Sequence, residues 1–396
     1  MEMSELRTLL TPEGLRLVDE LGTVDSTTAV ASAVSRLRAA GHSPELVSAV
    51  VAQARLRSRA HAKFGPFADR MLFTRAGLEQ ATRLGIAARH AGRFRQAGLA
   101  HVADLGCGIG GDALGLAALG IEVTAVDADE ATAAVAAYNL APFGDLAHVH
   151  HALAEDTDLA DVDGVWLDPA RRTAGGDHTQ RLRAEDFTPA LDWAFALADR
   201  LPTGIKLGPG FERADIPAHA EAQWISVDGS TIELVLWSGS LAREGVRRAA
   251  LVLRGDEAHE MTAAADAPDA PVRELGEFLH EPEGAVIRAR LIGDVARSLD
   301  AGMLDERIAY LTSDAALTSP FVQSFRVRET LPADEKKLAR ALRERDIGRL
   351  EIKKRGVDVD PAQLRTRLKL KGDQQATLFI TRIGDRRTAL LADRVS

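Results

Sequence analysis

The chain has 396 residues, of which 46% are hydrophobic and 27% are charged. This composition is typical of folded globular domains and excludes a wholly disordered, collagen-like or coiled-coil protein. The single cysteine, Cys107, excludes an internal disulfide framework and a zinc site built on cysteines. No apolar run approaches the length of a membrane span, and the N-terminus lacks the pattern of a signal peptide, so we expect a cytoplasmic protein.

Charge is distributed unevenly along the chain, although the whole carries a net charge of −9. Residues 1–100 have 14 basic and 9 acidic side chains, residues 101–317 have 16 and 38, and residues 318–396 have 19 and 11. Two basic ends therefore flank an acidic middle. This pattern favours an anionic partner for the ends, with solvated helix faces as the alternative interpretation.

The first hundred residues predict helices. Thr11-Pro12 and Ser43-Pro44 each place a capping hydroxyl before a proline at the first helical position. Apolar residues then recur at steps of three and four, as in a helix with one buried face. A further helix is expected over 75–97, directly before the first strand.

From residue 101 strands and helices alternate, which predicts a mostly parallel sheet. Thr188-Pro189 is expected to cap a helix that ends near Arg200. Asp228-Gly229 indicates a hairpin, which would add an antiparallel edge. The expected strands are 101–105, 121–126, 148–152, 165–167, 204–207, 223–227 and 232–237.

The remaining chain is less regular. Strand-like runs occur at 249–253 and 285–289. The tail alternates between helices and strands, and Asp360-Pro361 starts its second helix. We expect four parts: an N-terminal helical region (1–97), an α/β domain (98–245), a connecting α+β segment (246–317) and a small basic α+β domain (318–396).

A glycine-rich turn between the first strand and its helix carries the chemistry. It reads Asp104-Leu-Gly106-Cys-Gly108-Ile-Gly110-Gly111, and such a turn lets the backbone approach a nucleotide-like ligand closely. Gly106, Gly108 and Gly111 also fit a dinucleotide-binding pattern. However, the Asp104 carboxylate would repel a pyrophosphate and attract a cationic sulfonium and ammonium.

This turn resembles the first motif of the class I S-adenosylmethionine-dependent methyltransferases. The resemblance implies a Rossmann-like, doubly wound sheet and S-adenosyl-L-methionine as cofactor, bound by Asp104, Gly106, Gly108 and Gly110. Asp127 ends the second strand, where a carboxylate can accept hydrogen bonds from the ribose hydroxyls. By analogy Asp156 is the candidate that contacts adenine. No metal is expected, because the histidines lack carboxylates at ligand spacing.

The fourth strand ends in Asp168-Pro169-Ala170-Arg171. This stretch resembles the Asp/Asn-Pro-Pro-aromatic motif of methyltransferases that act on amino nitrogens of bases. The resemblance implies that Asp168 and Pro169 orient the target nitrogen, so that catalysis is largely positioning. Alanine and Arg171 replace the second proline and the aromatic residue; a guanidinium can also stack on a base.

The basic tail resembles the THUMP-like domain that follows some bacterial class I methyltransferases. The resemblance rests on Ile352-Lys-Lys-Arg-Gly356 and on the helix and hairpin after it. Leu350 and Ile352 alternate with charges, so one strand face is expected to be core and the other basic. The residues expected to bind RNA phosphates are Lys353, Lys354, Arg355, Arg365, Arg367, Lys369 and Lys371.

The sequence thus predicts a methyltransferase that modifies a base amino nitrogen in RNA. Two alternatives stay open. One is a methyltransferase for a small molecule or a protein, with the tail as a dimerisation module. The other is a non-catalytic RNA-binding protein that retains the cofactor fold. The target nucleotide and the oligomeric state do not follow from the sequence.

Overall fold

A computed structural model describes residues 3–171 and 187–395. The chain forms two compact units. The first comprises Met1–Leu207 and Leu236–Ala242, and the second comprises Gly208–Val235 and Arg243–Ser396. These units divide the chain differently from the four expected parts, which stay a proposal.

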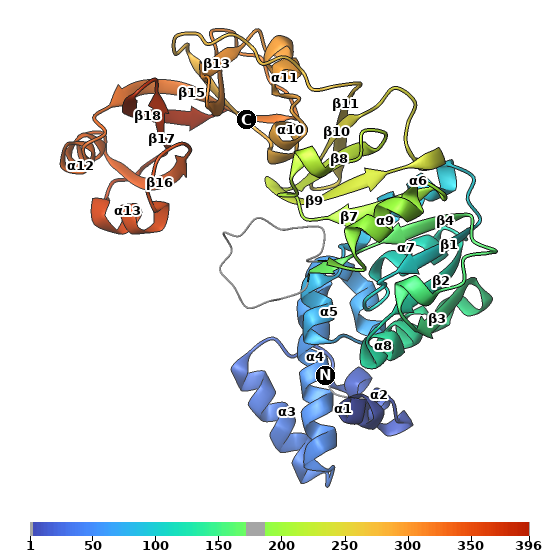
Figure 1. Cartoon of the computed structure of the whole chain (residues 1–396). Coiled ribbons are helices and arrows are strands. Elements are labelled where there is room, and N and C mark those ends of the chain that lie inside the picture. The colour runs from blue at the N-terminus through green and yellow to red at the C-terminus, as the bar shows by residue number, and fades with distance from the viewer. Residues whose placement is uncertain (1–2, 172–186, 396) are drawn as a thin grey trace. The chain divides into compact units, whose positions relative to one another are not determined.

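The first unit begins with four helices, coloured blue in Figure 1. Helix α4 is the longest, and the three others pack against it. The expected caps form: Thr11 Oγ1 accepts from the Gly14 amide at 3.0 Å, and Ser43 Oγ accepts from the Leu46 amide at 3.3 Å. The helices are α1 (Met3–Leu9), α2 (Pro12–Leu21), α3 (Thr27–Ala39) and α4 (Pro44–Phe64).

The single helix expected over 75–97 is two helices, α5 (Arg75–Gln80) and α6 (Leu84–Gln96), which follow the 3-10 turn η1 (Gly65–Arg70). The break has a physical reason. The half-buried side chain of Lys63 donates through its ammonium to the carbonyls of Leu78, Glu79 and Ala81, at 2.8 Å each. It therefore satisfies carbonyls at the end of α5 that would otherwise need further helix.

Parallel strands of the first unit lie in the order β7-β4-β1-β2-β3. The order reverses between β1 and β4, which makes a switch point at the carboxyl ends of these strands. The strands are β1 (His101–Leu105), β2 (Glu122–Asp127), β3 (Ala147–His151), β4 (Gly164–Leu167) and β7 (Thr203–Leu207). The connecting helices are α7 (Gly111–Ala118), α8 (Glu130–Leu140) and α9 (Leu191–Ala198), and the 3-10 turns are η2 (Ala141–Leu146) and η3 (Ala154–Asp156).

Thr188 does not cap α9, contrary to the sequence prediction. The residue before α9 is Ala190, and Thr188 belongs to the short strand β6 (Phe187–Thr188), which pairs with β5 (Ala170–Arg171). A threonine or serine followed by proline correctly predicted the N-caps of α2 and α4. Here strand pairing takes the place of capping.

The second unit holds the predicted hairpin, β8 (Glu221–Val227) and β9 (Ser230–Trp237), whose last two residues belong to the first unit. Asp228 and Gly229 have φ of 49° and 80°, as a tight hairpin turn requires. The sheet continues past the hairpin. Strand β10 (Arg248–Arg254) pairs in parallel with β8, and β11 (Glu257–Ala263) pairs antiparallel with β10.

A seven-stranded sheet forms the rest of the second unit, in the order β13-β14-β12-β15-β18-β17-β16. The run 285–289, expected as a strand, lies in helix α10 (Gly284–Arg288), because a short apolar run fits either element. The strands are β12 (Phe278–Pro282), β13 (Gly302–Asp305), β14 (Ile308–Ser313), β15 (Val322–Leu331), β16 (Ile347–Lys354), β17 (Gln374–Ile383) and β18 (Arg386–Arg394). The other helices are α11 (Ile292–Ser298), α12 (Glu335–Glu344) and α13 (Pro361–Leu368).

Candidate active site

The glycine turn folds back onto the end of the neighbouring strand. The amides of Gly106 and Cys107 both donate to the Val126 carbonyl, at 2.9 Å each. Gly106 has φ of 89°, and a Cβ there would lie 3.2 Å from the carbonyl oxygen of Asp168. The positive φ favours glycine here, and the close approach of the residue after the fourth strand leaves little room for a side chain. This approach brings the glycine turn and Asp168 together.

Asp104 is a buried carboxylate whose oxygens lack a well-formed hydrogen bond within the part of the chain that the structure describes. Its side chain is 1% exposed, and neither carboxylate oxygen has a hydrogen-bond partner among the described residues. Burial, together with nearby Asp112 and Asp168, raises the pKa of Asp104 well above its usual range, while Lys206 and the nearby Ala113 amide oppose the rise. Buried polar groups are nearly always paired, so an orphaned carboxylate beside a ligand-binding turn indicates a missing cationic or hydrogen-bonding partner.

Asp112, at the start of α7, is buried and fully paired. Thr82 Oγ1 donates to its Oδ2 at 2.7 Å, and His90 Nδ1 lies 2.9 Å from its Oδ1. Burial alone would raise the pKa of Asp112. The His90 hydrogen bond, the Lys206 charge and the Thr82 hydrogen bond outweigh burial and lower this pKa to about 2. Asp112 is therefore a fixed negative charge beside the turn.

Asp127 holds the turn in place from the end of β2. Its Oδ2 accepts from the Gly108 amide at 3.0 Å, and its Oδ1 accepts from the Asp129 amide at 2.9 Å. Asp129 is the N-cap of α8. A carboxylate has about four acceptor positions, so Asp127 retains capacity for ribose hydroxyls. Asp156, the candidate adenine contact, is exposed at the end of η3.

Asp168 and Pro169 follow β4 at the switch point. Asp168 is half-buried, and its Oδ2 lies 2.5 Å from the ammonium of Lys206 on β7. The side chain of Arg171, the third candidate catalytic residue, lies outside what the structure describes. The sequence analysis did not single out Lys206 as a site residue, and it did not identify Thr82 and Asp112 as neighbours of Lys206. The one signal for Lys206 was its position as the sole charged residue of strand β7.

The segment before α5 is tied to the glycine turn through Asn139 of α8. The Asn139 side chain pairs with the backbone of Leu72 through its Oδ1 at 2.7 Å and its Nδ2 at 3.0 Å, and Nδ2 also donates to the Ile109 carbonyl at 2.9 Å. Gln53 of α4 pairs with the Phe73 backbone in the same way. The N-terminal helices are therefore part of the scaffold that holds the site.

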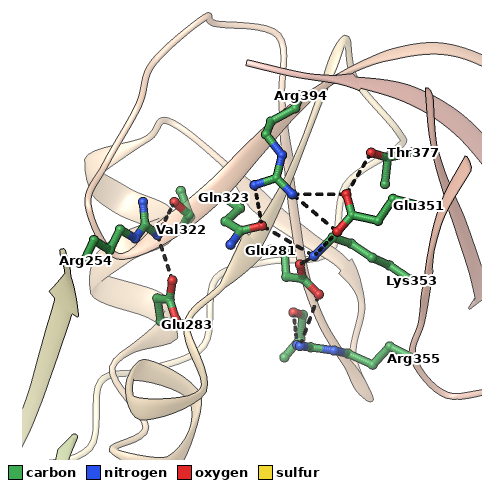
Figure 2. Close-up of polar contacts among 11 residues, drawn as sticks. Arg254, Glu281, Glu283, Val322, Gln323, Glu351, Lys353, Arg355, Thr377 and Arg394 are labelled. Carbon is green, nitrogen blue, oxygen red and sulfur yellow. Dashed lines mark hydrogen bonds and ion pairs between the residues drawn. The ribbon is translucent and has the colours of Figure 1, made fainter. Parts of the chain in front are cut away.

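Two of the tail's basic residues are engaged inside the second unit, as Figure 2 shows. Lys353 lies 2.5 Å from Glu281 and 3.5 Å from Glu351. Arg355 donates to the Ala309 carbonyl at 2.6 Å. Arg367 is also paired, with Glu335 at 3.0 Å. The other candidate phosphate-binding residues are exposed on the surface: Lys354, Arg365, Lys369 and Lys371.

Known proteins share most of this chain. Two curated relatives, both described as uncharacterized S-adenosylmethionine-dependent methyltransferases of Mycobacterium tuberculosis strains, are 34% identical over 365 residues, which span 88% of this chain and 95% of theirs. The chain belongs to the S-adenosylmethionine-dependent methyltransferases. Its enzyme class and its cofactor, S-adenosylmethionine, are thereby established, as the sequence predicted.

The other comparisons concern the parts of this methyltransferase. A THUMP domain-like family model matches residues 322–394, which confirms the predicted tail domain, and a domain of unknown function matches residues 2–60. A solved structure from Porphyromonas gingivalis, assigned as a methyltransferase, matches with a TM-score of 0.69 and 20% identity over 94% of this chain and 100% of that one. This likeness supports the predicted α/β fold.

Neither a membrane span nor a metal cluster occurs among the described residues. No helix in this part of the chain is long and apolar enough to cross a membrane. Over 3–171 and 187–395, no group of three or more histidine, cysteine, aspartate or glutamate side chains is placed to hold a metal ion.

Proposed function

We propose that this methyltransferase modifies an amino nitrogen of a base in RNA. The observation that carries the proposal is the contact between the glycine turn and the end of β4. A Cβ on Gly106 would lie only 3.2 Å from the Asp168 carbonyl oxygen, so the two backbone segments are in close contact. A substrate atom held by Asp168 would therefore lie next to the cofactor-binding turn, as methyl transfer requires.

The residues around the turn suit the cofactor. The orphaned carboxylate of Asp104 is complementary to the positive charges of S-adenosylmethionine, and Asp127 is complementary to its ribose hydroxyls. Gly106, Gly108 and Gly110 allow close backbone approach, and Asp156 remains the proposed adenine contact. When bound, the cofactor supplies an electrophilic methyl group.

Asp168 would act on the substrate rather than on the cofactor. A carboxylate accepts hydrogen bonds from an amino group and so aligns the nitrogen lone pair. Pro169 is buried and fixes the backbone after Asp168. Arg171 is retained as a proposed contact to the base. RNA as substrate class is supported by the THUMP domain-like match and by the exposed basic residues of the tail.

The experiment is incubation of the full chain with S-adenosylmethionine labelled in the methyl group and size-fractionated cellular RNA, followed by nucleoside analysis. We expect label in one RNA fraction, on an exocyclic amino nitrogen. Label on carbon, on a ribose oxygen, or only on protein or small molecules would overturn the proposal. Binding of RNA without label transfer would favour the non-catalytic alternative.

Asp168 variants test the assignment of the residue that holds the substrate. Asp168→Ala should lower turnover by about a hundredfold or more while S-adenosylhomocysteine affinity changes less than about threefold, because Asp168 touches the substrate and not the cofactor. Asp168→Asn keeps an acceptor oxygen and should retain more activity than the alanine variant. Equal loss of turnover and cofactor affinity would show that Asp168 belongs to the cofactor site instead.

A further inference from the structure

Lys206 is a nearly buried lysine whose ammonium contacts residues of the candidate site. It is the fourth residue of β7, and its side chain is 11% exposed. Its ammonium lies 2.5 Å from Asp168 Oδ2, donates to Thr82 Oγ1 at 2.9 Å, and lies 3.9 Å from Asp112 Oδ2. Burying an ammonium is costly unless it is paired, so this placement requires the acidic neighbours.

These interactions continue into the core of the first unit. The Thr82 hydroxyl donates a hydrogen bond to Asp112 Oδ2, and Asp112 Oδ1 forms a hydrogen bond with His90 Nδ1. The His90 ring packs on Trp166 of β4, with ring centroids 4.4 Å apart. Trp166 precedes Asp168 by two residues. The position of the Lys206 ammonium is therefore fixed by packed groups on several elements, which a flexible surface lysine lacks.

The charges around Asp168 explain why a cation is needed there. The charge of Asp104 on β1 interacts with that of Asp168. Asp112 on α7 lies 3.9 Å from Lys206, the ion-pair partner of Asp168. Lys63 on α4 is near enough to Lys206 for their charges to interact; burial and the Lys206 charge lower the pKa of Lys63. Three carboxylates in one largely buried cluster repel one another, and a like charge favours protonation of its neighbour. Lys206 offsets that repulsion at Asp168.

We propose that Lys206 is a positioning residue: it keeps the Asp168 carboxylate ionised and in one orientation, so that this carboxylate accepts a hydrogen bond from the target amino group. The inference rests on the proposed role of Asp168 in the reaction. A protonated or rotated Asp168 would present a donor, or no group, to the substrate nitrogen. Lys206 itself contacts neither the substrate nor the methyl group in this proposal.

The first test needs no substrate. Aspartate carboxyl carbons are labelled with 13C in the full chain, and their NMR signals are followed as pH changes. The Asp168 signal is the one that is missing from the spectrum of Asp168→Asn. In Lys206→Met the pKa of Asp168 should rise by about one unit or more, since a neighbouring cation is removed beside two acidic groups. Lys63→Met is the matched control, because it removes a nearby ammonium whose hydrogen bonds go to backbone carbonyls at the end of α5. An unchanged Asp168 titration in Lys206→Met overturns the proposal.

The second test uses the RNA fraction that accepts label from the wild-type protein. At pH 7, Lys206→Met should lower kcat by about tenfold or more with KM and S-adenosylhomocysteine affinity within about threefold, and activity should recover as pH rises. In an Asp168→Asn background the same substitution should cost little and add no pH dependence, because an amide does not titrate. Equal losses in both backgrounds would indicate a merely structural lysine and overturn the proposal.

Lys206→Arg keeps the inference testable if the methionine variant does not fold. Arginine retains the positive charge, so Asp168 should titrate near its wild-type pKa and turnover should exceed that of Lys206→Met. Thermal melts of all variants report folding. If no RNA fraction accepts label, the proposed substrate fails, while the carboxyl titration still decides whether Lys206 controls Asp168.

Discussion

Asp104 is a buried residue that lowers stability at neutral pH, and it is the proposed partner of the cofactor's positive charges. Its carboxylate is buried without a hydrogen-bond partner among the described residues, and its pKa is raised by burial first and then by Asp112 and Asp168. The folded state therefore holds the proton to higher pH than the unfolded state does. Stability is lost as pH rises from about 4, the ordinary pKa of aspartate, through the raised pKa of the folded state.

Asp104→Asn should therefore stabilise the cofactor-free protein at neutral pH. We expect the free energy of unfolding to rise by about 1.4 kcal/mol for each unit by which folding raises the pKa of Asp104, since asparagine keeps the shape and does not ionise. The gain should shrink towards zero near pH 4. Denaturant unfolding between pH 4 and 8 measures it. Calorimetry should show weaker S-adenosylhomocysteine binding, and a variant that is both less stable and fully able to bind would contradict this account.

At the scale of elements, strand β16 shows that adjacent basic residues have different roles. Lys353 is 17% exposed, pairs with Glu281 and lies over the Phe325 ring, whereas Lys354 is exposed. The sequence analysis grouped both with Arg355 as phosphate contacts. Figure 2 shows Lys353 and Arg355 directed at Glu281, so these two residues hold β16 to β12 within the second unit.

Substitution of the two groups of basic residues should give opposite results. Lys353→Met should destabilise the protein by about 2–4 kcal/mol, because it leaves the largely buried Glu281 carboxylate with a weaker partner. Changing Lys354, Arg365, Lys369 and Lys371 together to glutamine should leave the thermal melt unchanged and weaken RNA binding. For single-stranded RNA, the logarithm of the binding constant falls linearly with the logarithm of the salt concentration. The magnitude of this salt slope should decrease by about 0.7 for each phosphate that the variant no longer neutralises.

This prediction is tested by measuring the RNA affinity of each variant at several salt concentrations, together with its thermal melt. Lys336→Gln/Lys337→Gln on α12 is the control, since both residues are exposed in the same domain, and its effect is compared per charge removed. An equal effect of the control would show that only net charge matters. An unchanged salt slope in the fourfold variant would move the dimerisation interpretation of the tail ahead of RNA binding.

At the scale of the whole molecule, the second unit should be the acid-sensitive part. His280 on β12 is 0% exposed, and its ring nitrogens pair with Ser324 at 2.8 Å and Ser313 at 2.9 Å. Burial lowers the pKa of His280 to about 4. The folded state thus resists protonation that the unfolded state accepts below about 6.5. Stability is present above that pH and is lost as pH falls towards 4.

The expected loss between pH 6.5 and 4 is up to about 3 kcal/mol from this one residue. Denaturant unfolding at a series of pH values, followed by far-UV circular dichroism, measures it. His280→Gln should be less stable at pH 7.5 but should show a flatter dependence below pH 6.5. The same steep dependence in His280→Gln would assign the acid sensitivity to another group.

The local pattern of the sequence was enough to predict the strand, the glycine turn and the helix that follow one another here. A strand, a glycine turn and a helix are consecutive in the chain, and their carboxylates Asp104 and Asp127 fall at strand ends by spacing alone. Asp168 was predictable for the same reason, because carboxyl ends of parallel strands meet at one edge of a sheet. The hairpins and most strand bounds followed from residue alternation and turn residues.

Only the tertiary structure decided which charged groups meet. Lys206 and Thr82 are 124 residues apart, and Lys353 and Glu281 are 72 apart. No periodicity links such residues, so the sequence could give the sign of each charge but not its partner. The same limit explains Thr188, whose helix-capping pattern is overridden by strand pairing with Ala170. Propensity acts over a few residues, whereas burial and ion pairing depend on which distant segments the folded chain brings together.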